Sequence, residues 1–395
     1  MASIALAGLV GCNDQGGNPV VPPAPACSNP DSLAPGNRFL TKHKGPARIK
    51  ARAASLPGTK WADGAVAAAF FGDKDFKLVF TQNRRMFLLA YVDGKPVLTE
   101  ISQGDESLGG QAGSIHSPLF SADGKKIAFQ GTGLGRPSFI QGADIGENET
   151  WRIPLDPKGH VTAEPHWYVE GGKTWIYFAT MAGPVKYSDN CKNLPGGTFR
   201  SEVIGDTALG PMQVTGIDGA YRGGLSKDGR WAGTTYLTST LFDAESKGTV
   251  VLAGGRQQCN PSMNPFPSGG PHTDYMMILA FGGTYGSVSG PVSEGLHENF
   301  WIYNKADKIV WQGRRPDEKF YLRWDKPEWS THPRYATAVA LPIGDENNGD
   351  LFVVKIGDLA EAKTDTVAQA QGYLKIGSGS FNSDSFSHLW VDETK

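Results

Sequence analysis

Histidines are the residues of this chain whose type and spacing first point to chemistry. Six of the eight stand near starts of short apolar segments or beside turns: His116, His166, His272, His297, His332 and His388. His116, His166 and His388 begin three similar segments, HSPLFSADG, HWYVEGG and HLWV. If these segments lie side by side, the three imidazoles form a donor set that suits zinc, manganese or iron. The favoured alternative is that they are polar side chains in contact with water, with no cofactor bound.

Two further segments carry candidate binding residues. In DKPEWSTHPRY (325–335), Trp329, His332, Arg334 and Tyr335 cluster in the sequence. Residues 254–274 are rich in Gly, Pro and Asn and end with His272 and Asp274, and loops of that length are usually functional or disordered. Aromatic groups stack on sugars and anchor protein partners, so we expect a binding surface here. The alternative is that the aromatic side chains fill the core.

Motifs for nucleophilic or nucleotide chemistry are absent from the sequence. There is no GxSxG, no HExxH, no P-loop and no GxGxxG that opens a helix. Ser330 and His332 are close in sequence, but such adjacency says nothing about triad geometry. Asp123-Gly124 and Asp228-Gly229 are typical of turns, in which Gly accepts a positive φ. We therefore predict no catalytic residue from these motifs.

The charge balance argues against polyanionic partners. The chain has 38 basic and 40 acidic residues and no Lys/Arg-rich run. No overall field therefore attracts nucleic acid or an anionic membrane. A protein or a glycan is the expected partner.

The N-terminal segment is typical of an exported protein. Residues 1–12, MASIALAGLVGC, are apolar and end in a sequence that resembles the bacterial lipobox, so Cys12 is the expected lipidation site. The segment lacks basic residues at its start, which leads us to expect that the natural chain begins further upstream. Residues 13–37 are mostly Pro, Gly, Asn and Ser, which predicts a flexible tether. The expected location is the bacterial cell envelope, on the outer membrane, in the periplasm or at the surface, with the lipid as the sole membrane contact.

Cysteine use fits an oxidising compartment. Of the four cysteines, Cys191 and Cys259 stand in loop-like segments rich in Gly, Pro and Asn, and we expect a disulfide between them. No CxxC occurs, which argues against a structural zinc site and a thioredoxin-like centre.

The remaining chain, 38–395, is predicted to be all-β. It combines 51 Gly and 26 Pro with many aromatic residues, a composition that suits short strands joined by tight turns. Residues 66–82 and 86–102 predict four strands with a hairpin turn at Asp93-Gly94. The best helical candidate is 358–371.

One strand–turn–strand unit recurs along the chain. SPLFSADGKKIAF (117–129) aligns with PHWYVEGGKTWIYF (165–178) and with RGGLSKDGRWAGT (222–234). HPRYATAVA (332–340) and SHLWV (387–391) are similar to its first strand, and a weaker copy begins near 259–265. Spacings of roughly 45 to 65 residues are typical of propeller blades of four strands each. We expect blades near 61–105, 110–157, 161–215, 219–258, 259–313 and 326–375, and a closing element in which 38–61 completes the strand at 387–391.

The best copy carries a family resemblance. Residues 118–129, Pro-x-aromatic-Ser-x-Asp-Gly-Lys-x-Ile-Ala-Phe, resemble the PD40 repeat of TolB-like, or WD40-like, β-propellers. Other copies depart from it: Gly171 replaces the Asp, His166 replaces the Pro, and 232–234 replace Ile-Ala-Phe. Residues 296–313 and 324–340 are similar to bacterial lipoproteins that contain this repeat.

The repeats predict a six- or seven-bladed β-propeller, the N-terminal segment predicts a lipid anchor, and the resemblance implies a module for binding proteins or glycans. It also implies an alternative, because some polysaccharide lyases on this fold hold a divalent metal with a histidine cluster. In that case His116, His166 and His388 would be the ligands in the central channel of a metal-dependent carbohydrate-active enzyme. A fold alone does not choose between these functions.

Overall fold

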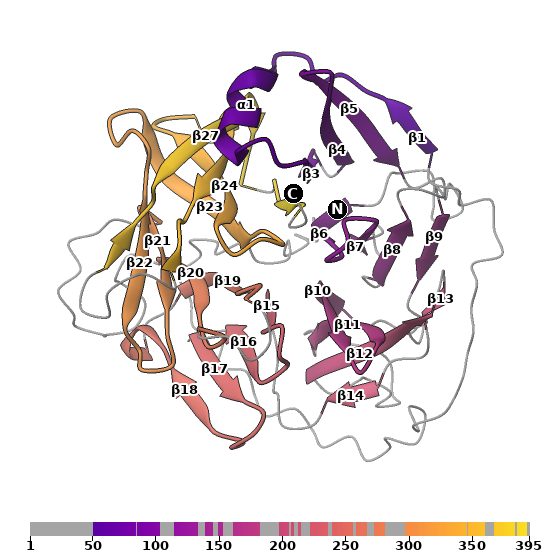
Figure 1. Cartoon of the computed structure of the whole chain (residues 1–395), viewed down its shortest axis with the longest axis vertical. Coiled ribbons are helices and arrows are strands. Elements are labelled where there is room, and N and C mark those ends of the chain that lie inside the picture. The colour runs from indigo at the N-terminus through magenta and orange to yellow at the C-terminus, as the bar shows by residue number, and fades with distance from the viewer. Residues whose placement is uncertain are drawn as a thin grey trace, which may run out of the picture.

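The computed structural model shows an all-β propeller (Figure 1). It describes residues 50–83, 85–102, 114–132, 139–144, 149–152, 161–181, 197–204, 207–208, 212–214, 222–235, 239–255, 258–266, 272–280, 297–345, 347–359, 367–383 and 385–392. The signal segment with Cys12, the tether and the first residues of the 38–395 domain lie outside this range. The described strands form six sheets.

Three of the sheets consist of strands consecutive in the chain, all antiparallel. The second sheet contains β6 (Ser114–Phe120), β7 (Lys126–Thr132), β8 (Phe139–Asp144) and β9 (Glu149–Arg152). The third contains β10 (Val161–Glu170), β11 (Lys173–Met181), β12 (Gly197–Ile204) and β13 (Thr207–Ala208), with β14 (Met212–Val214) also pairing with β12. The fourth contains β15 (Arg222–Leu225), β16 (Trp231–Thr235), β17 (Ser239–Asp243) and β18 (Thr249–Val251), and a short 3-10 turn, η3 (Ala253–Gly255), follows it.

The other three sheets take a strand from a distant part of the chain. The first contains β28 (Ser387–Val391), β3 (Phe76–Gln82), β4 (Arg85–Val92), β5 (Lys95–Ser102) and β1 (Lys50–Ala53). The fifth contains β19 (Gln258–Met263), β20 (Met276–Ala280), β21 (Asn299–Tyr303), β22 (Ile309–Arg314) and the parallel β26 (Ala368–Gln369). The sixth contains β23 (Tyr321–Trp329), β24 (Tyr335–Pro342), β25 (Gly349–Lys355), β27 (Gly372–Phe381) and β2 (Lys60–Trp61).

The innermost strands close a ring. β28 contacts β6, and contacts continue through β10, β15, β19 and β23, which meets β28 again. Figure 1 shows these strands around a central axis, with the later strands of each sheet farther out. Closure protects the sheet faces and leaves only short edges.

Apolar cores lie between neighbouring sheets. Phe300 and Trp311 of the fifth sheet pack against Trp324 and Phe352 of the sixth. Equivalent clusters join the sixth sheet to the first, the first to the second, and the fourth to the fifth. A sheet of this size buries both faces only between neighbours, which explains why the chain repeats the unit.

The end of the chain completes the first sheet. The expectation that 38–61 completes the blade of the strand at 387–391 is confirmed only in part: β1 belongs to the same sheet, but the direct partner of β28 is β3, from Val391↔Phe76 to Ser387↔Phe80. β1 and β2, which come from the expected segment, instead extend the outer edges of the first and sixth sheets.

Two expected strands are placed differently. Residues 66–71, expected to be a strand, belong to α1 (Gly64–Phe71). Alanine favours a helix, Asp63 caps its start by accepting from the Ala65 N–H at 2.8 Å, and Gly72 ends it with φ +65°. The segment HPRYATAVA (332–340) was expected to be a first strand. It forms β24, which is the second strand of its sheet, and the innermost strand is β23.

The helix expected at 358–371 falls partly on residues outside the described range. Its described end forms the strand β26. No described helix is long and apolar enough to cross a membrane.

Candidate functional site

A repeated irregularity interrupts five of the innermost strands. The register shifts between His116 and Leu119, and equivalent shifts precede His166, Leu225, Ser262 and Glu328. A bulge of this kind adds a residue to one strand and redirects its side chains. His166 is therefore equivalent to Leu119, not to Pro118, with which the sequence alignment pairs it.

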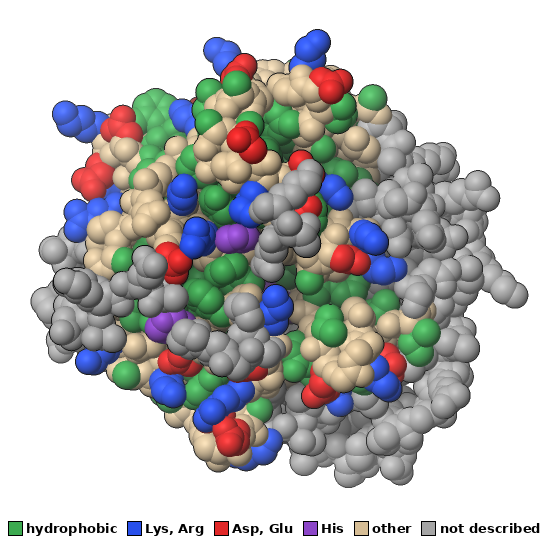
Figure 2. All heavy atoms as spheres, viewed as in Figure 1, with side chains coloured by type: hydrophobic (Ala, Val, Ile, Leu, Met, Phe, Trp, Pro, Cys, Tyr) green, Lys and Arg blue, Asp and Glu red, His purple; other side chains and the backbone are tan. Residues whose placement is uncertain are grey.

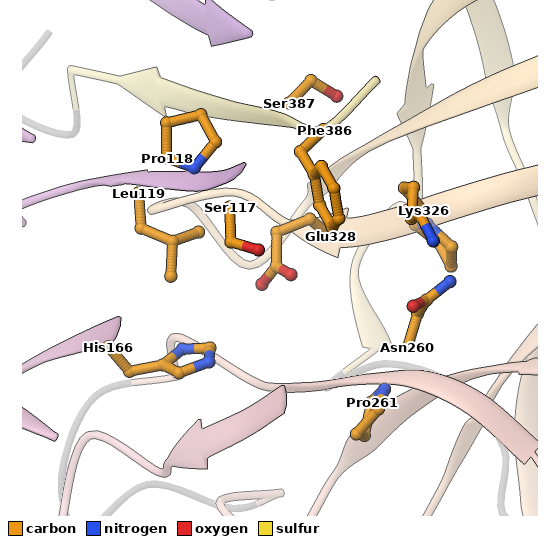
Figure 3. A pocket seen from close by; sticks show the side chains of 11 residues that line it. Ser117, Pro118, Leu119, His166, Asn260, Pro261, Lys326, Glu328, Phe386 and Ser387 are labelled. Atoms are coloured by element: carbon orange, nitrogen blue, oxygen red, sulfur yellow. The ribbon is translucent and has the colours of Figure 1, made fainter. Parts of the chain in front are cut away.

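Three of the bulges hold an unusual backbone conformation. Ser117, Asn260 and Lys326 have φ values of +47°, +45° and +46°, and each precedes a proline. Left-handed conformations are costly for such residues and persist where their surroundings enforce them. All three side chains line a small cavity of about 20 Å³ on the axis (Figure 3).

This axial cavity is narrow, and its lining mixes apolar and polar side chains. Figure 3 shows the Glu328 carboxylate, the Ser117 hydroxyl and the His166 ring projecting into the central space from three different sheets. Its volume suits a single water-sized group. The channel is thus constricted at this level.

A larger funnel opens above the axial cavity. It has a volume of about 330 Å³, and residues of all six sheets and their adjoining turns line it. Leu119, His166 and Glu328 line both spaces, so the funnel adjoins the axial cavity. A funnel of this size accepts a side chain or a short chain segment.

One wall of the funnel is apolar. Val169 is 57% exposed, and Trp167 and Leu225 are half-buried. Trp167 is fixed across two sheets, because its indole N–H donates to the Leu119 carbonyl at 2.9 Å. This wall offers apolar surface held in a defined position.

Charged groups lie at two levels of the funnel. Lys126, Lys227 and Asp123 line it on the turns that form the rim, and Glu328 lines the floor. The Ser262 hydroxyl donates to Glu328 Oε1 at 2.5 Å and accepts from the Trp329 N–H at 3.0 Å. On the face in Figure 2, basic and acidic side chains are interspersed around the ring.

His388 lies at the funnel floor, beside the axis. Its Nδ1 accepts a hydrogen bond from the Phe120 N–H at 3.0 Å, and the backbone of Trp329 also hydrogen-bonds with the imidazole. Burial lowers the pKa of His388 to about 3, and the nearby His166 adds to this effect. The imidazole is therefore neutral at pH 7.

The predicted metal ligands are only partly brought together. His166 and His388 lie near one another, while His116 belongs to β6 and its side chain is outside the described residues. The lone pair of His388 Nδ1 already accepts the Phe120 N–H, so in this arrangement that imidazole does not fit a metal ligand. In the described part of the chain, no group of three or more His, Cys, Asp or Glu side chains is placed to hold a metal. A metal site that includes His116 stays a prediction.

The first predicted binding cluster lies at the same mouth, on the turn between β23 and β24. Trp329 lines the funnel but is almost fully buried, and its indole N–H donates to the Pro333 carbonyl at 3.0 Å. Tyr335 is buried in the core. Burial lowers the pKa of the half-buried His332 to about 4, and the exposed Arg334 pairs with Asp358 at 2.6 Å. A binding role for these residues remains a prediction.

His272 and Asp274 lie on the turn between β19 and β20. The His272 ring packs on Tyr275 with centroids 4.5 Å apart, and Asp274 accepts from the Lys305 N–H at 2.9 Å. Both have partners within the fifth sheet, and their binding role also remains a prediction.

The predicted disulfide involves one residue with a described backbone. Cys259 belongs to β19 and pairs with Leu279, so it is not in a loop as expected. Its side chain and all of Cys191 lie outside the described residues.

Sequence reasoning did not single out Trp167, Val169, Leu225 or Glu328. A usable signal was the X-Pro pair that recurs in four first strands: Ser117-Pro118, Glu164-Pro165, Asn260-Pro261 and Lys326-Pro327. The residue after each pair lies at the level of the funnel floor. Aligning these pairs would have identified Glu328 and would have paired His166 with Leu119.

Comparisons with known proteins agree with the architecture without identifying the chain. No family model matches it, and no curated protein matches it. Similar solved structures include a TolB protein from Agrobacterium tumefaciens, at 12% identity over 81% of this chain and 99% of that chain, with a TM-score of 0.44. Another is AztD from Citrobacter koseri, at 8% identity over 80% of this chain and 98% of that one, with a TM-score of 0.38. Such remote likeness says nothing of function, and the fold assignment stands on the six described sheets and their closure.

Proposed function

We propose that this chain is an exported, lipid-anchored β-propeller that binds a segment of a protein partner in its funnel. The observation that carries the proposal is the funnel itself, about 330 Å³ in volume, with an apolar wall at Trp167, Val169 and Leu225. A solvent-open apolar wall with a few polar groups is the usual composition of a ligand pocket. Binding alone needs only a surface of suitable shape and chemistry, which the described lining residues provide.

A protein segment fits the funnel wall better than a glycan does. Sugars bind on exposed aromatic faces, whereas Phe120, Tyr168 and Trp329 of the lining are buried. The accessible part of the wall has one half-buried aromatic ring, Trp167, beside the aliphatic Val169 and Leu225, of which Val169 is the most exposed. Aliphatic side chains of a partner are the natural complement to such a surface.

Two finer features belong to the same proposal. The ring has six blades, one for each described sheet; the closed order of contacts among the innermost strands supports this number. Cys12 carries the lipid and residues 13–37 form the tether, as their composition indicates. The tether would hold the propeller at the membrane of the cell envelope.

Site-specific photocrosslinking tests the proposal in cells. A photoreactive amino acid at Val169, inside the funnel, should give a discrete protein adduct. The same amino acid at Val251 is the matched control, because Val251 is also an exposed valine on a strand, 48% against 57%, but lies outside the funnel lining. Trp167→Ala should reduce the Val169 adduct, and the purified partner should bind the wild type more tightly than this variant.

Three outcomes would contradict the proposal. Equal adducts from Val169 and Val251 would show non-specific contact, and no adduct from Val169 would show that no protein occupies the funnel. Binding to a glycan panel that depends on Trp167 would change the ligand class to carbohydrate.

A further inference from the structure

We propose that the end of the ring opposite the funnel rests on the membrane, through an apolar patch of Phe320, Leu322 and Ile343 that enters the surface of a zwitterionic lipid layer. This inference rests on the lipid anchor of the proposed function and adds a second membrane contact to it. The patch sets the orientation of the propeller, with the funnel open on the side away from the bilayer.

The patch gathers the largest exposed apolar side chains of the fold. In the described part of the chain, four apolar side chains larger than valine are well exposed, and three of them are Phe320, Leu322 and Ile343, at 53%, 41% and 57%. The fourth is Ile204, in the third sheet. Exposed apolar residues that stand singly are ordinary, whereas a group of them that includes an aromatic ring marks a contact surface.

The three side chains belong to one end of one strand pair. Phe320 directly precedes β23, and its carbonyl accepts the N–H of Ile343, which directly follows β24, at 3.0 Å. Leu322 stands two residues along β23, where the register shifts between Tyr321 and Arg323. The backbone under the patch is therefore fixed by the sixth sheet.

The patch and the funnel are at opposite ends of the sixth sheet. β23 begins beside the patch and ends at Trp329, which lines the funnel. A strand of nine residues spans roughly 30 Å. One end of the ring can therefore contact a membrane while the other end receives a partner.

The chain enters the fold at the patch end of the ring. Lys50, the first residue of β1, pairs with Ser102 at the end of β5, next to the turn between β3 and β4. At that turn the Gln82 amide donates to the Ser380 carbonyl of the sixth sheet. Ser380 lies where the end of β27 meets the start of β25, after the turn that begins at Ile343. A chain that reaches the ring at Lys50 therefore arrives on the side of the patch.

The length of the proposed tether favours this contact. As a flexible coil, residues 13–37 would span roughly 25–30 Å on average. A lipid on Cys12 would thus hold the entry end of the ring close to the bilayer. Contact from a tethered state has an effective concentration in the millimolar range, so a patch with weak affinity of its own can stay bound.

The charges around the patch favour zwitterionic lipid over anionic lipid. The charged side chains next to it in the sequence or in space are Asp317, Glu318, Lys319, Arg323, Asp345 and Lys375. Three are acidic and three are basic, and Lys375 is already paired with the buried Asp350 at 2.8 Å. Burial of apolar surface, not attraction to anionic headgroups, therefore supplies the binding, and the contact should be insensitive to salt.

The first test places a fluorescent, environment-sensitive amino acid in the lipidated full chain, on vesicles of phosphatidylcholine and phosphatidylethanolamine. At Phe320 or Ile343 the emission should shift to the blue, and doxyl-labelled lipid should reduce its intensity. Val169 and Val97 are the matched controls, because they are exposed to similar extents, 57% and 43%, but stand at the funnel end of the third and first sheets. Neither control should show a shift or a loss of intensity.

The second test measures the patch without the anchor, in the full chain with Cys12→Ala. Binding is then weak and is titrated at high lipid concentration. Adding Phe320→Ser and Ile343→Ser should weaken it about tenfold or more, whereas Val97→Ser with Val169→Ser should leave it unchanged. Phosphatidylglycerol in the vesicles should not strengthen it.

Several results would overturn the inference. They are no shift at Phe320 and Ile343, an equal shift at the two controls, binding that survives loss of the patch, and binding that requires phosphatidylglycerol. A photoreactive amino acid at Phe320 that gives an adduct with a second copy of the chain or another protein would make the patch a protein interface instead. In each case the Val169 adduct tests the funnel separately and fractionation of Cys12→Ala tests the anchor, so the proposed function can stand when the patch fails.

Discussion

His388 Nδ1 accepts the Phe120 N–H at 3.0 Å, and this hydrogen bond joins the last strand of the ring to the innermost strand of the second sheet. The same arrangement occurs between the fifth and sixth sheets, where Ser262 Oγ accepts the Trp329 N–H at 3.0 Å. In both cases a side chain of one innermost strand satisfies a backbone donor of the next. Neighbouring innermost strands therefore hold each other by side chain to backbone bonds at the level of the funnel floor.

Removing the acceptor at His388 should destabilise the ring. His388→Leu leaves the buried Phe120 N–H without this partner, which costs about 1–3 kcal/mol of unfolding free energy. His388→Asn places a carbonyl oxygen near the position of Nδ1 and should recover most of the loss. Urea denaturation of the three proteins measures the difference, and a leucine variant as stable as the wild type would contradict the role assigned to His388.

The fold should lose stability in mild acid. His388 and His332 have pKa values near 3 and 4 in the folded protein, against 6.5 ordinarily. Between pH 6.5 and about 4 the unfolded chain binds protons that the fold excludes, so the unfolding free energy falls as the pH falls. Each histidine contributes up to roughly 1.4 kcal/mol per pH unit within this window and nothing above it.

Urea midpoints from pH 7.5 down to 4.5 test this dependence. Asp243, with a pKa lowered to about 2, adds acid sensitivity only below its ordinary value of 3.8 and so lies outside the window. His388→Asn removes one of the two titrations and should give a shallower decline. Identical pH slopes for the variant and the wild type would refute the assignment to His388.

The repeat and its boundaries could be predicted from the sequence because strand alternation and Asp-Gly turns are local signals. The unit 117–129 corresponds to β6, the Asp123-Gly124 turn and β7. The partner of the closing strand could not be predicted, since β28 pairs with β3 across almost the whole chain. β23 was missed because the bulge at Lys326-Pro327 breaks the alternation that marks a strand.

The candidate site was predictable only in part, for a related reason. His166 and His388 were expected near the axis and lie there. Glu328 was not, because its position depends on a register shift that moves it to the funnel floor. Trp167 and Leu225 come from different sheets, so their common wall exists only after the ring closes.

The predicted lipid anchor is tested by one substitution. Cys12→Ala removes the only thiol of the lipobox-like segment and should move the protein from the membrane fraction to the soluble fraction. Cys27→Ala, in the predicted tether, is the matched control and should leave the protein with the membranes. Metabolic labelling with a fatty acid should be lost only in the Cys12 variant. Membrane association unchanged by Cys12→Ala would disprove the anchor.

Two of the Asp-Gly turns are locked by an aromatic side chain of the neighbouring sheet. A Cβ at Gly124 would lie 2.5 Å from the Trp390 ring, and one at Gly229 would lie 2.0 Å from the Tyr168 hydroxyl. These aromatic residues each stand two positions after His388 or His166, so the contact repeats between two pairs of sheets. Gly94 also follows an aspartate in a turn, here one in which Asp93 has a positive φ as well, and its own φ is similar, +70° against +64° and +69°, but nothing lies within 4 Å of a Cβ there.

Alanine at these three glycines therefore separates backbone strain from steric collision. Gly94→Ala should cost only the strain of a positive φ, on the order of 1 kcal/mol. Gly124→Ala and Gly229→Ala add the displacement of Trp390 or Tyr168 and should cost about 1–3 kcal/mol more. Urea denaturation measures the three losses side by side. Because Tyr168 also lines the funnel, Gly229→Ala should weaken binding of the partner as well, whereas Gly94→Ala should not. Equal losses at all three positions would show that contact between neighbouring sheets at the turns contributes nothing.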